Sequence, residues 1–450
     1  MGSAGLLLVF CVSTATTSLA QAAGAELSLW PMPAESKLLS AQCLAVSDQD
    51  AFEFQTESSS RILKDAIARY QKLAFLHGGG EQPCASTLDT PGSAPLATLT
   101  ALTISIESAD ETLGPSTLEN YTLNVVAPTG TLVAASVFGA LRGLETFAQL
   151  QFDSVGKRLL PSVSVQDSPR FGYRAIMVDT ARMFRPVSLL EKMLDAMVSA
   201  KLNVLYLHLT DDGCWPLEIE GYPLLTANCS KGCSADGHTG GQFYSQADIR
   251  SLVSYALSRG IRVIPEIDSP GHFDTGHCYP ELLTKADYPC PGAGPGTGYF
   301  RSTPDPSNPA LWAFFKGVFG EVATLFPDPY VSLGGDEAWL TPWTCSPPVK
   351  QWMAAKNFTL DAAAHYYEQQ LFSIVSGETG AKQTMMWAPG EAVVSNSTIH
   401  IVWTGWPQNG PSDGWKNDFA SLTAKGQPVV RAVALLPLPF NSFPHSTVQA

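Results

Sequence analysis

The feature that most constrains the fold is a regular alternation of strand-like and helix-like segments after residue 170. Strand-like apolar segments occupy residues 173–179, 203–209, 261–267, 330–333, 384–387 and 399–403. Helical spacing of apolar residues separates several of them, as at 188–198 and 309–325. Strands that alternate with helices pair in parallel, and this many units in series indicate a barrel. We therefore predict an α/β fold, a (β/α)8 TIM-type barrel, over residues 169–450.

A smaller domain is predicted before the barrel. Residues 61–75 and 137–150 have apolar side chains at helical spacing, whereas 97–107 and 121–126 alternate as strands do. These patterns indicate an α+β domain over residues 24–168. No cluster of potentially catalytic side chains stands out in its sequence.

The N-terminal residues and the cysteines indicate the secretory pathway. An apolar run at residues 6–12 precedes small residues, which predicts a signal peptide over 1–23; a buried N-terminal strand is the alternative. The other cysteines are Cys43, Cys84, Cys214, Cys229, Cys233, Cys278, Cys290 and Cys345. An even number after a signal peptide indicates disulfides. The spacing of Cys229 and Cys233 also suits zinc, but no second close pair of ligands accompanies it, so no metal is expected. Glycosylation sequons begin at Asn120, Asn228, Asn357 and Asn396.

Composition excludes several classes of partner. The chain has 45% hydrophobic residues, too many for a wholly disordered protein, and a net charge of −14. The acidic balance argues against nucleic acid and anionic membranes as partners. No stretch reaches the roughly 18 apolar residues that a membrane span needs. The balance suits a neutral substrate or an acidic compartment.

Acidic residues and tryptophans recur where the predicted strands end, which is where β/α barrels carry their reactive groups. In chain order they are Asp179, Asp211, Asp212, Glu266, Asp268 with His272, Asp336, Glu337, Trp387, Trp403 and Trp406. Indole rings stack on the apolar faces of sugars, while carboxylates bind hydroxyls and transfer protons. A single Asp could cap a helix and a single Trp could belong to the core, but their recurrence indicates a sugar site.

The pair Asp336 and Glu337 is the sharpest element of this pattern. The preceding Gly334 and Gly335 allow the tight turn that presents both acids at the rim of the barrel. Neighbouring carboxylates disfavour double ionisation, so the pKa of one should be raised. A carboxyl that keeps its proton near neutral pH can act as a general acid.

Several motifs carry a resemblance to a known family. They are YRAIMVDTARMF at 173–184, HLTDD at 208–212, IPEIDSPGH at 264–272 and LGGDEAW at 333–339. The chain resembles family 20 glycoside hydrolases, more specifically eukaryotic β-N-acetylhexosaminidases of the lysosomal α/β-subunit type. LWPMP at 29–33, ENYTL at 119–123 and GALRGLETFAQL at 139–150 resemble the non-catalytic domain of that family. The resemblance covers about residues 26 to 430.

The resemblance implies an exo-acting hydrolase that removes terminal non-reducing N-acetyl-β-D-hexosamine from a glycan or glycoconjugate. In its substrate-assisted retaining mechanism, the 2-acetamido oxygen of the substrate attacks the anomeric carbon. Glu337 would be the general acid and later the base, and Asp336 would orient the acetamido group. His272 with Asp211 would form a relay onto Glu337. No cofactor is implied.

Other residues receive binding or structural roles by the same resemblance. Arg174 would hold hydroxyls of the terminal sugar, and Trp387 and Trp403 would line the acetamido pocket. Structural alternatives are that His272 caps a loop and that Arg174 pairs with Asp179. The resemblance also implies a homodimer located in the lysosome or vacuole, or outside the cell.

Two disulfides follow from the resemblance, namely Cys43–Cys84 and Cys290–Cys345. The other four cysteines are additional to the family pattern. Their pairing is left open by the sequence, with Cys229–Cys233 and Cys214–Cys278 as the preferred pairs.

The C-terminal residues depart from the family pattern. After Val430 the family continues with strands that carry sugar-binding Tyr, Asp, Trp and acidic residues, and residues 431–450 contain none of these motifs. The last strands of the barrel are therefore expected to be missing. Two functions stay open, an active β-N-acetylhexosaminidase and a truncated, inactive sugar-binding or subunit-partner protein.

Overall fold

The computed structural model describes most of the chain between residues 27 and 432. The described residues are 27–76, 82–84, 95–154, 156–212, 214–233, 241–273, 275, 278–285, 290, 303–378, 383–388, 398–403 and 420–432. The predicted signal peptide at 1–23 lies outside them.

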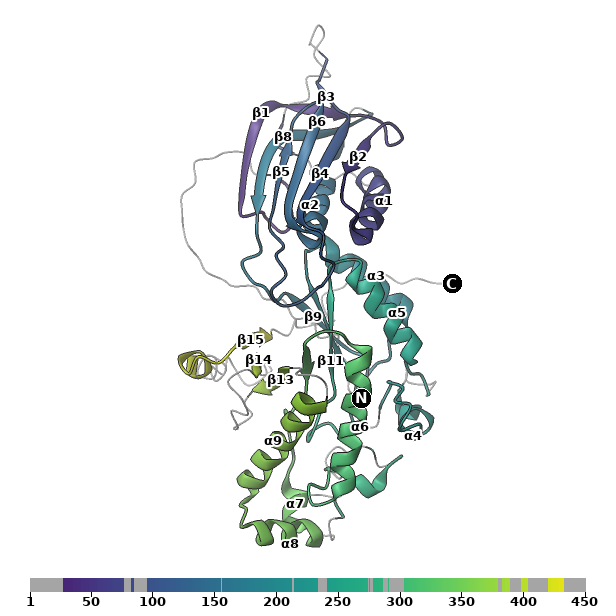
Figure 1. Cartoon of the computed structure of the whole chain (residues 1–450), viewed down its shortest axis with the longest axis vertical. Coiled ribbons are helices and arrows are strands. Elements are labelled where there is room, and N and C mark those ends of the chain that lie inside the picture. The colour runs from purple at the N-terminus through teal and green to yellow at the C-terminus, as the bar shows by residue number, and fades with distance from the viewer. Residues whose placement is uncertain are drawn as a thin grey trace, which may run out of the picture.

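The described residues form two sheets, each with its own hydrophobic core (Figure 1). The first sheet has eight strands in the order β2-β4-β6-β5-β8-β1-β3, with β7 paired to β8. The second has seven strands, all parallel, in the order β15-β14-β13-β12-β11-β10-β9. The parallel, sequential order of the second sheet is the α/β arrangement that the sequence predicts for a TIM-type barrel.

The first sheet is covered on one face by two helices. Its strands are β1 (Glu35–Val46), β2 (Glu53–Thr56), β3 (Thr98–Leu99), β4 (Ala101–Ser108), β5 (Tyr121–Val125), β6 (Thr129–Ser136), β7 (Phe152–Ser154) and β8 (Lys157–Asp167). The helices are α1 (Arg61–Leu76) and α2 (Val137–Gln149), as predicted. The Ser136 side chain caps α2. A Cβ at Gly143 would collide with Leu132, so the glycine permits α2 to lie close on the sheet.

The second sheet alternates with helices along the chain. Its strands are β9 (Ala175–Asp179), β10 (Val204–His208), β11 (Arg262–Glu266), β12 (Tyr330–Ser332), β13 (Gln383–Ala388), β14 (Ile399–Trp403) and β15 (Val429–Ala432). The helices are α3 (Val187–Ser199), α4 (Leu224–Ala227), α5 (Gln246–Leu257), α6 (Pro309–Leu325), α7 (Thr341–Cys345), α8 (Pro347–Lys356) and α9 (Leu360–Glu378), with short 3₁₀ turns η2 (Cys229–Gly232) and η3 (Pro280–Leu282). β15 is one strand more than the six predicted, and it pairs in parallel with β14. None of the described helices is both long and apolar enough to cross a membrane.

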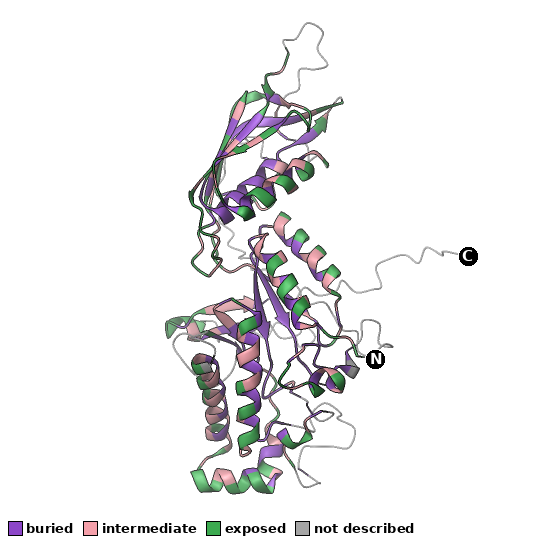
Figure 2. Cartoon of the chain, turned by 45° about the vertical axis from the view of Figure 1, so that its right-hand side comes forward, coloured by how far each residue is buried: buried purple, intermediate pink, exposed green. Residues whose placement is uncertain are grey.

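Alternate residues of the parallel strands face opposite sides of the second sheet. Tyr206 and Trp387 belong to an interior cluster with Met177 and Ile264, whereas Leu205 packs in the core that contains the helices. Figure 2 shows the buried character of these strands in purple and the mixed faces of the surrounding helices. Polar residues occupy the last interior position of four neighbouring strands, in register as Asp179, His208, Glu266 and Ser332. The carboxyl edge of the sheet is therefore polar inside.

Four disulfides join the described cysteines, and two of these bridges differ from the prediction. Cys43–Cys84 and Cys290–Cys345 are confirmed. The remaining bridges are Cys214–Cys233 and Cys229–Cys278, so the expected Cys229–Cys233 and Cys214–Cys278 pairs are wrong. The reason is the direction of the side chains around η2. Cys229 packs with Cys278 in the main core, whereas Cys233 packs with Ala181 and Cys214 in a separate cluster.

Candidate active site

Three loops at the carboxyl edge of the second sheet bring the predicted acids and histidine together. Asp211 follows β10, His272 follows β11, and Asp336 and Glu337 follow β12. The Nδ1 atom of His272 lies 3.2 Å from Oδ1 of Asp211, and its Nε2 atom lies 3.3 Å from Oε2 of Glu337. The Asp211 side chain is buried, whereas that of Glu337 is 56% exposed. The three residues form a chain that leads from the interior to a solvent-accessible carboxyl group.

Glycines allow these loops to approach one another. Gly334 has a φ of 64°, and a Cβ there would collide with the carboxylate of Asp268. A Cβ at Gly271 would collide with the backbone oxygen of Asp336. Glu337 itself has a φ of 49°, an uncommon value for a side-chain-bearing residue. The backbone is thus arranged tightly around the two acids, as the glycine pair in the sequence predicts.

The charges around His272 favour its protonated form. Burial alone lowers its pKa, but the hydrogen bond to Asp211 and the nearby charges of Asp268, Asp211 and Asp336 raise it to about 9. Burial likewise raises the pKa of Asp211 by itself. Hydrogen bonds from His208 and His272, with the charge of Arg182, instead hold the pKa of that carboxyl far below its usual range. At neutral pH the Asp211 carboxylate therefore faces a histidine cation.

A raised pKa falls on Asp336, one of the two neighbouring acids. Burial is the main cause, and the charge of Glu266 adds to it, while His272 opposes it. Burial and the charge of Asp336 raise the pKa of Asp268 as well. One carboxylate oxygen of Asp268, one ring nitrogen of His272 and one carboxylate oxygen of Asp336 all lie within 4.8 Å of one another. The buried Asp268 carboxyl and the partly buried Asp336 carboxyl thus share the charge of one histidine, and their raised pKa values limit how much negative charge they carry.

An arginine that sequence reasoning did not select lies at the same edge. Arg182 Nη1 lies 2.9 Å from Oδ2 of Asp179, and Arg182 Nη2 lies 2.6 Å from Oδ2 of Asp211. Its side chain is 46% exposed. Burial alone lowers the pKa of Arg182, but Asp211 and Asp179 raise it. A partly exposed guanidinium held by two acids can donate hydrogen bonds to sugar hydroxyls.

Arg174 lies at the opposite end of the strand, which contradicts its predicted role at the mouth of the barrel. It precedes β9, and its Nη2 atom lies 2.8 Å from Oε2 of Glu119 in the first domain. Its Nε also donates to the backbone oxygen of Lys201 at 2.9 Å. Glu119 in turn contacts Arg142 Nε at 2.7 Å. Arg174 therefore joins the two domains, and the alternative pairing with Asp179 is also wrong.

The two candidate tryptophans differ in what the structure describes. Trp387 lies on the interior face of β13, and its Nε1 donates to Oε2 of Glu266 at 2.8 Å. Its ring packs edge-on against Tyr206, with centroids 6.2 Å apart. Trp403 is the last residue of β14, and its side chain lies outside the described part of the chain. Their role in binding an acetamido group stays a prediction.

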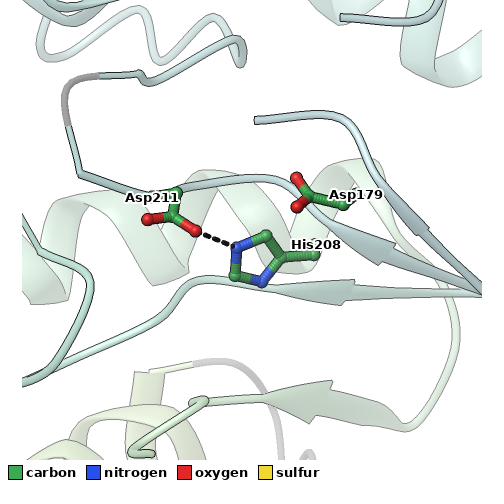
Figure 3. Close-up of side chains that lie close together, drawn as sticks. All are labelled: Asp179, His208 and Asp211. Atoms are coloured by element: carbon green, nitrogen blue, oxygen red, sulfur yellow. Dashed lines mark hydrogen bonds and ion pairs between the residues drawn. The ribbon is translucent and has the colours of Figure 1, made fainter. Parts of the chain in front are cut away.

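His208 adds a second histidine to the site, which sequence reasoning did not select. Its Nε2 lies 3.0 Å from Oδ2 of Asp211 (Figure 3). Its Nδ1 bonds Glu266. Asp179 lies beside it on the neighbouring strand, in register. The HLTDD motif could have indicated this role, because His208 is the last interior residue of its strand before Asp211 and Asp212. Asp211 is therefore held by both histidines and by Arg182.

Several groups of these residues have the ligand types of a metal site. One is Asp179, His208 and Asp211, and another is Asp268, His272 and Asp336. In the first group, Arg182 already places a cation 2.6 Å from Oδ2 of Asp211. In the second, the protonated form of His272 supplies positive charge to the two carboxyls. The arrangement is suited to proton transfer and charge stabilisation by the protein's own groups.

The chain matches known families and proteins over most of its length. The profile "Glycosyl hydrolase family 20, catalytic domain" matches residues 171–434, and "beta-acetyl hexosaminidase like" matches residues 29–150. "Beta-hexosaminidase subunit beta" of Mus musculus is 32% identical over 438 residues, covering 94% of this chain and 77% of that protein. The same subunit of Felis catus is 34% identical over 447 residues, covering 96% and 78%.

A solved structure agrees with these matches. The Flavobacterium johnsoniae chitobiase superposes with a TM-score of 0.71 and 28% identity, covering 90% of this chain and 59% of that chain. This chain thus spans about three quarters of the two subunits above and about three fifths of the chitobiase chain. The family 20 catalytic-domain profile and the mouse and cat subunits all match this chain. The chain therefore belongs to glycosyl hydrolase family 20.

Proposed function

We propose that this chain is an exo-acting glycoside hydrolase that removes terminal non-reducing N-acetyl-β-D-hexosamine residues by substrate-assisted retaining catalysis. Residues 169–450 would form the catalytic domain and 24–168 the non-catalytic one. The observation that carries the proposal is the chain Asp211–His272–Glu337, which ends on an exposed carboxyl group beside Asp336. The hexosaminidase relatives support the substrate class.

Glu337 is suited to be the general acid and base. Its carboxyl group is the solvent-accessible end of the series Asp211–His272–Glu337. It can therefore reach the oxygen between the terminal sugar and the rest of the glycan. After it gives its proton to that oxygen, its carboxylate lies 3.3 Å from Nε2 of protonated His272. The histidine cation stabilises this state, and Glu337 can next take a proton from the attacking water.

Asp336 is suited to hold the acetamido group of the substrate. Its Oδ1 atom is buried and has no hydrogen-bond partner among the described residues. An acceptor in that condition can accept a hydrogen bond from the acetamido N–H. When the acetamido oxygen attacks the anomeric carbon, positive charge develops on the nitrogen, and the Asp336 carboxylate would stabilise it.

Arg182, Trp387 and Trp403 would complete the binding of the terminal sugar. Arg182 presents an exposed guanidinium at the carboxyl edge and replaces Arg174 as the candidate for binding sugar hydroxyls. The indoles of Trp387 and Trp403 would pack around the acetamido methyl group and the sugar ring.

The wider setting is proposed from the disulfides and the relatives. Four bridges are typical of a protein of the secretory pathway. Within that pathway we place the protein in the lysosome or vacuole, or outside the cell. Asn120 and Asn357 are exposed and can carry glycans. The mouse and cat relatives are named as subunits, and we propose a homodimer for this chain.

Three chromogenic substrates test the proposal. The chain should release the chromophore from an N-acetyl-β-glucosaminide and from an N-acetyl-β-galactosaminide, and it should turn over the plain β-glucoside poorly. Equal turnover of the plain glucoside would exclude substrate assistance. Saturable binding of N-acetylglucosamine without any turnover would instead identify an inactive sugar-binding protein.

A further inference from the structure

Four hydrogen-bond donors converge on one carboxyl group inside the second sheet. Glu266, the last residue of β11, is fully buried. Its Oε2 accepts from the Ser332 hydroxyl and the Trp387 Nε1, each at 2.8 Å, and from the Tyr206 hydroxyl. Its Oε1 contacts Nδ1 of His208. Five residues from four strands therefore meet at this carboxyl.

A carboxylate matches this set of partners. An ionised Glu accepts at both oxygens, whereas a Gln at the same place would direct an amide NH₂ towards groups that are themselves donors. The negative charge of Glu266 has its counterpart in His208, which is also buried. Burial alone lowers the pKa of His208, but its bonds to Asp211 and Glu266 raise it well above the usual value. A buried charged pair thus lies at this point.

Glu266 and His208 connect two parts of the candidate active site, the Trp387 indole and the Asp211 carboxylate. On one side, Glu266 holds the indole nitrogen of Trp387. On the other, His208 Nε2 lies 3.0 Å from Oδ2 of Asp211, whose Oδ1 contacts His272. The hydrogen-bonded path therefore runs from Trp387 through Glu266, His208 and Asp211 to His272, whose Nε2 lies 3.3 Å from Oε2 of Glu337.

We propose that Glu266 and His208 are positioning residues that fix Trp387 and Asp211 relative to each other. The proposal rests on the proposed function, because it assigns Trp387 to sugar binding and Asp211 to the proton chain. One buried carboxylate then sets the distance between the group that receives the sugar and the group that protonates its leaving oxygen. A displacement of about 1 Å in such a geometry can cost on the order of 10²-fold in rate.

Kinetic constants distinguish the contribution of Glu266 from that of His208. Glu266→Gln weakens the contacts on both sides, so it should lower kcat about 10²-fold and raise KM for the N-acetyl substrate. His208→Gln leaves the Trp387–Glu266 bond in place. It should therefore lower kcat with a much smaller change in KM.

A matched control comes from the other end of the same strand. Arg262 and Asp328 form a second buried ion pair, with Arg262 Nε 2.6 Å from Asp328 Oδ2. Asp328→Asn removes a buried charge as Glu266→Gln does, but far from the carboxyl edge. It should lower the midpoint of thermal unfolding and leave kcat and KM unchanged for the folded fraction.

The outcomes separate this inference from the proposed function. Wild-type chain without hexosaminidase activity refutes both. Active wild type with Glu266→Gln and His208→Gln behaving like Asp328→Asn refutes the positioning role alone. If neither variant folds, Tyr206→Phe removes one donor to Glu266 with little change of shape. It should reduce kcat/KM about 10- to 100-fold, in the range of one lost hydrogen bond to a charged group, and an unchanged value would overturn the inference.

Discussion

The Nε2 atom of His272 lies 3.3 Å from Oε2 of Glu337, and the other ring nitrogen of His272 faces Asp211. A histidine held in this way has a fixed orientation and can donate in two directions only when it is protonated. The exposed carboxyl of Glu337 thus has a partly buried cation behind it. This relationship gives the site a direction, from a buried acid towards solvent.

Replacing Glu337 by Gln should remove most of the hydrolytic activity. The amide keeps the volume of the side chain but can neither give nor take the proton, so we expect kcat/KM to fall about 10²- to 10⁴-fold. Glu281→Gln is a suitable control, because that exposed residue lies in η3 and no hydrogen bond or ion pair among the described residues joins its side chain to Asp211, His272 or Glu337. A Glu337→Gln variant with the wild-type rate on the N-acetyl-β-glucosaminide would remove Glu337 from the mechanism.

Activity should decline as the pH rises through about 9, because His272 then loses its proton. The pKa of folded His272 is raised above its ordinary value of 6.5. The charge therefore stabilises the folded state fully below pH 6.5, and this contribution is lost as the pH passes about 9. The measurement is the pH dependence of kcat/KM. His272→Asn should abolish this alkaline limb, and a variant that retains it would assign the limb to another group.

Arg182 and Arg174 should respond to substitution in different ways. Arg182→Ala removes a partly exposed cation at the carboxyl edge, so KM should rise while the unfolding temperature changes little. Arg174→Ala breaks a buried pair with Glu119 at the domain boundary and should destabilise the protein by about 3 kcal/mol, with normal kinetic constants. Kinetics and thermal unfolding of both variants decide between these roles. A rise in KM for Arg174→Ala alone would restore the original assignment.

The arginine at the carboxyl edge is Arg182 and not Arg174, and this could not be predicted from the sequence. Arg174 and Arg182 lie in one motif, and only the exact bounds of β9 decide which end of the sheet each occupies. Asp211, His272, Asp336 and Glu337 could be predicted because each follows a strand whose apolar pattern is clear. The roles of His208 and Glu266 depend on the register between strands, which no local pattern specifies. The pairing of Cys229 and Cys233 likewise depends on side-chain directions around a short turn.

The revised disulfides can be checked directly. Digestion without reduction should yield one peptide pair joined by Cys214–Cys233 and another joined by Cys229–Cys278. Removing the first bridge with Cys214→Ser and Cys233→Ser should cost about 3 kcal/mol, because a loop of this length is no longer restrained in the unfolded chain. Mass spectrometry of the linked peptides is the measurement. A linked Cys214–Cys278 peptide would support the pairing expected from sequence instead.

The domain boundary should weaken in acid through Glu119. Burial alone raises the pKa of Glu119, but the charges of Arg142 and Arg174, and their hydrogen bonds, lower it below its usual 4.5. The ionised form therefore stabilises the folded state above pH 4.5, and this contribution is lost as the pH falls through the lower, folded-state pKa. Thermal unfolding from pH 7 to pH 3 should show the loss in the wild type. Glu119→Gln should unfold at a lower temperature at pH 7 and depend less on pH in this range. Equal slopes for the two proteins would show that the acid sensitivity arises elsewhere.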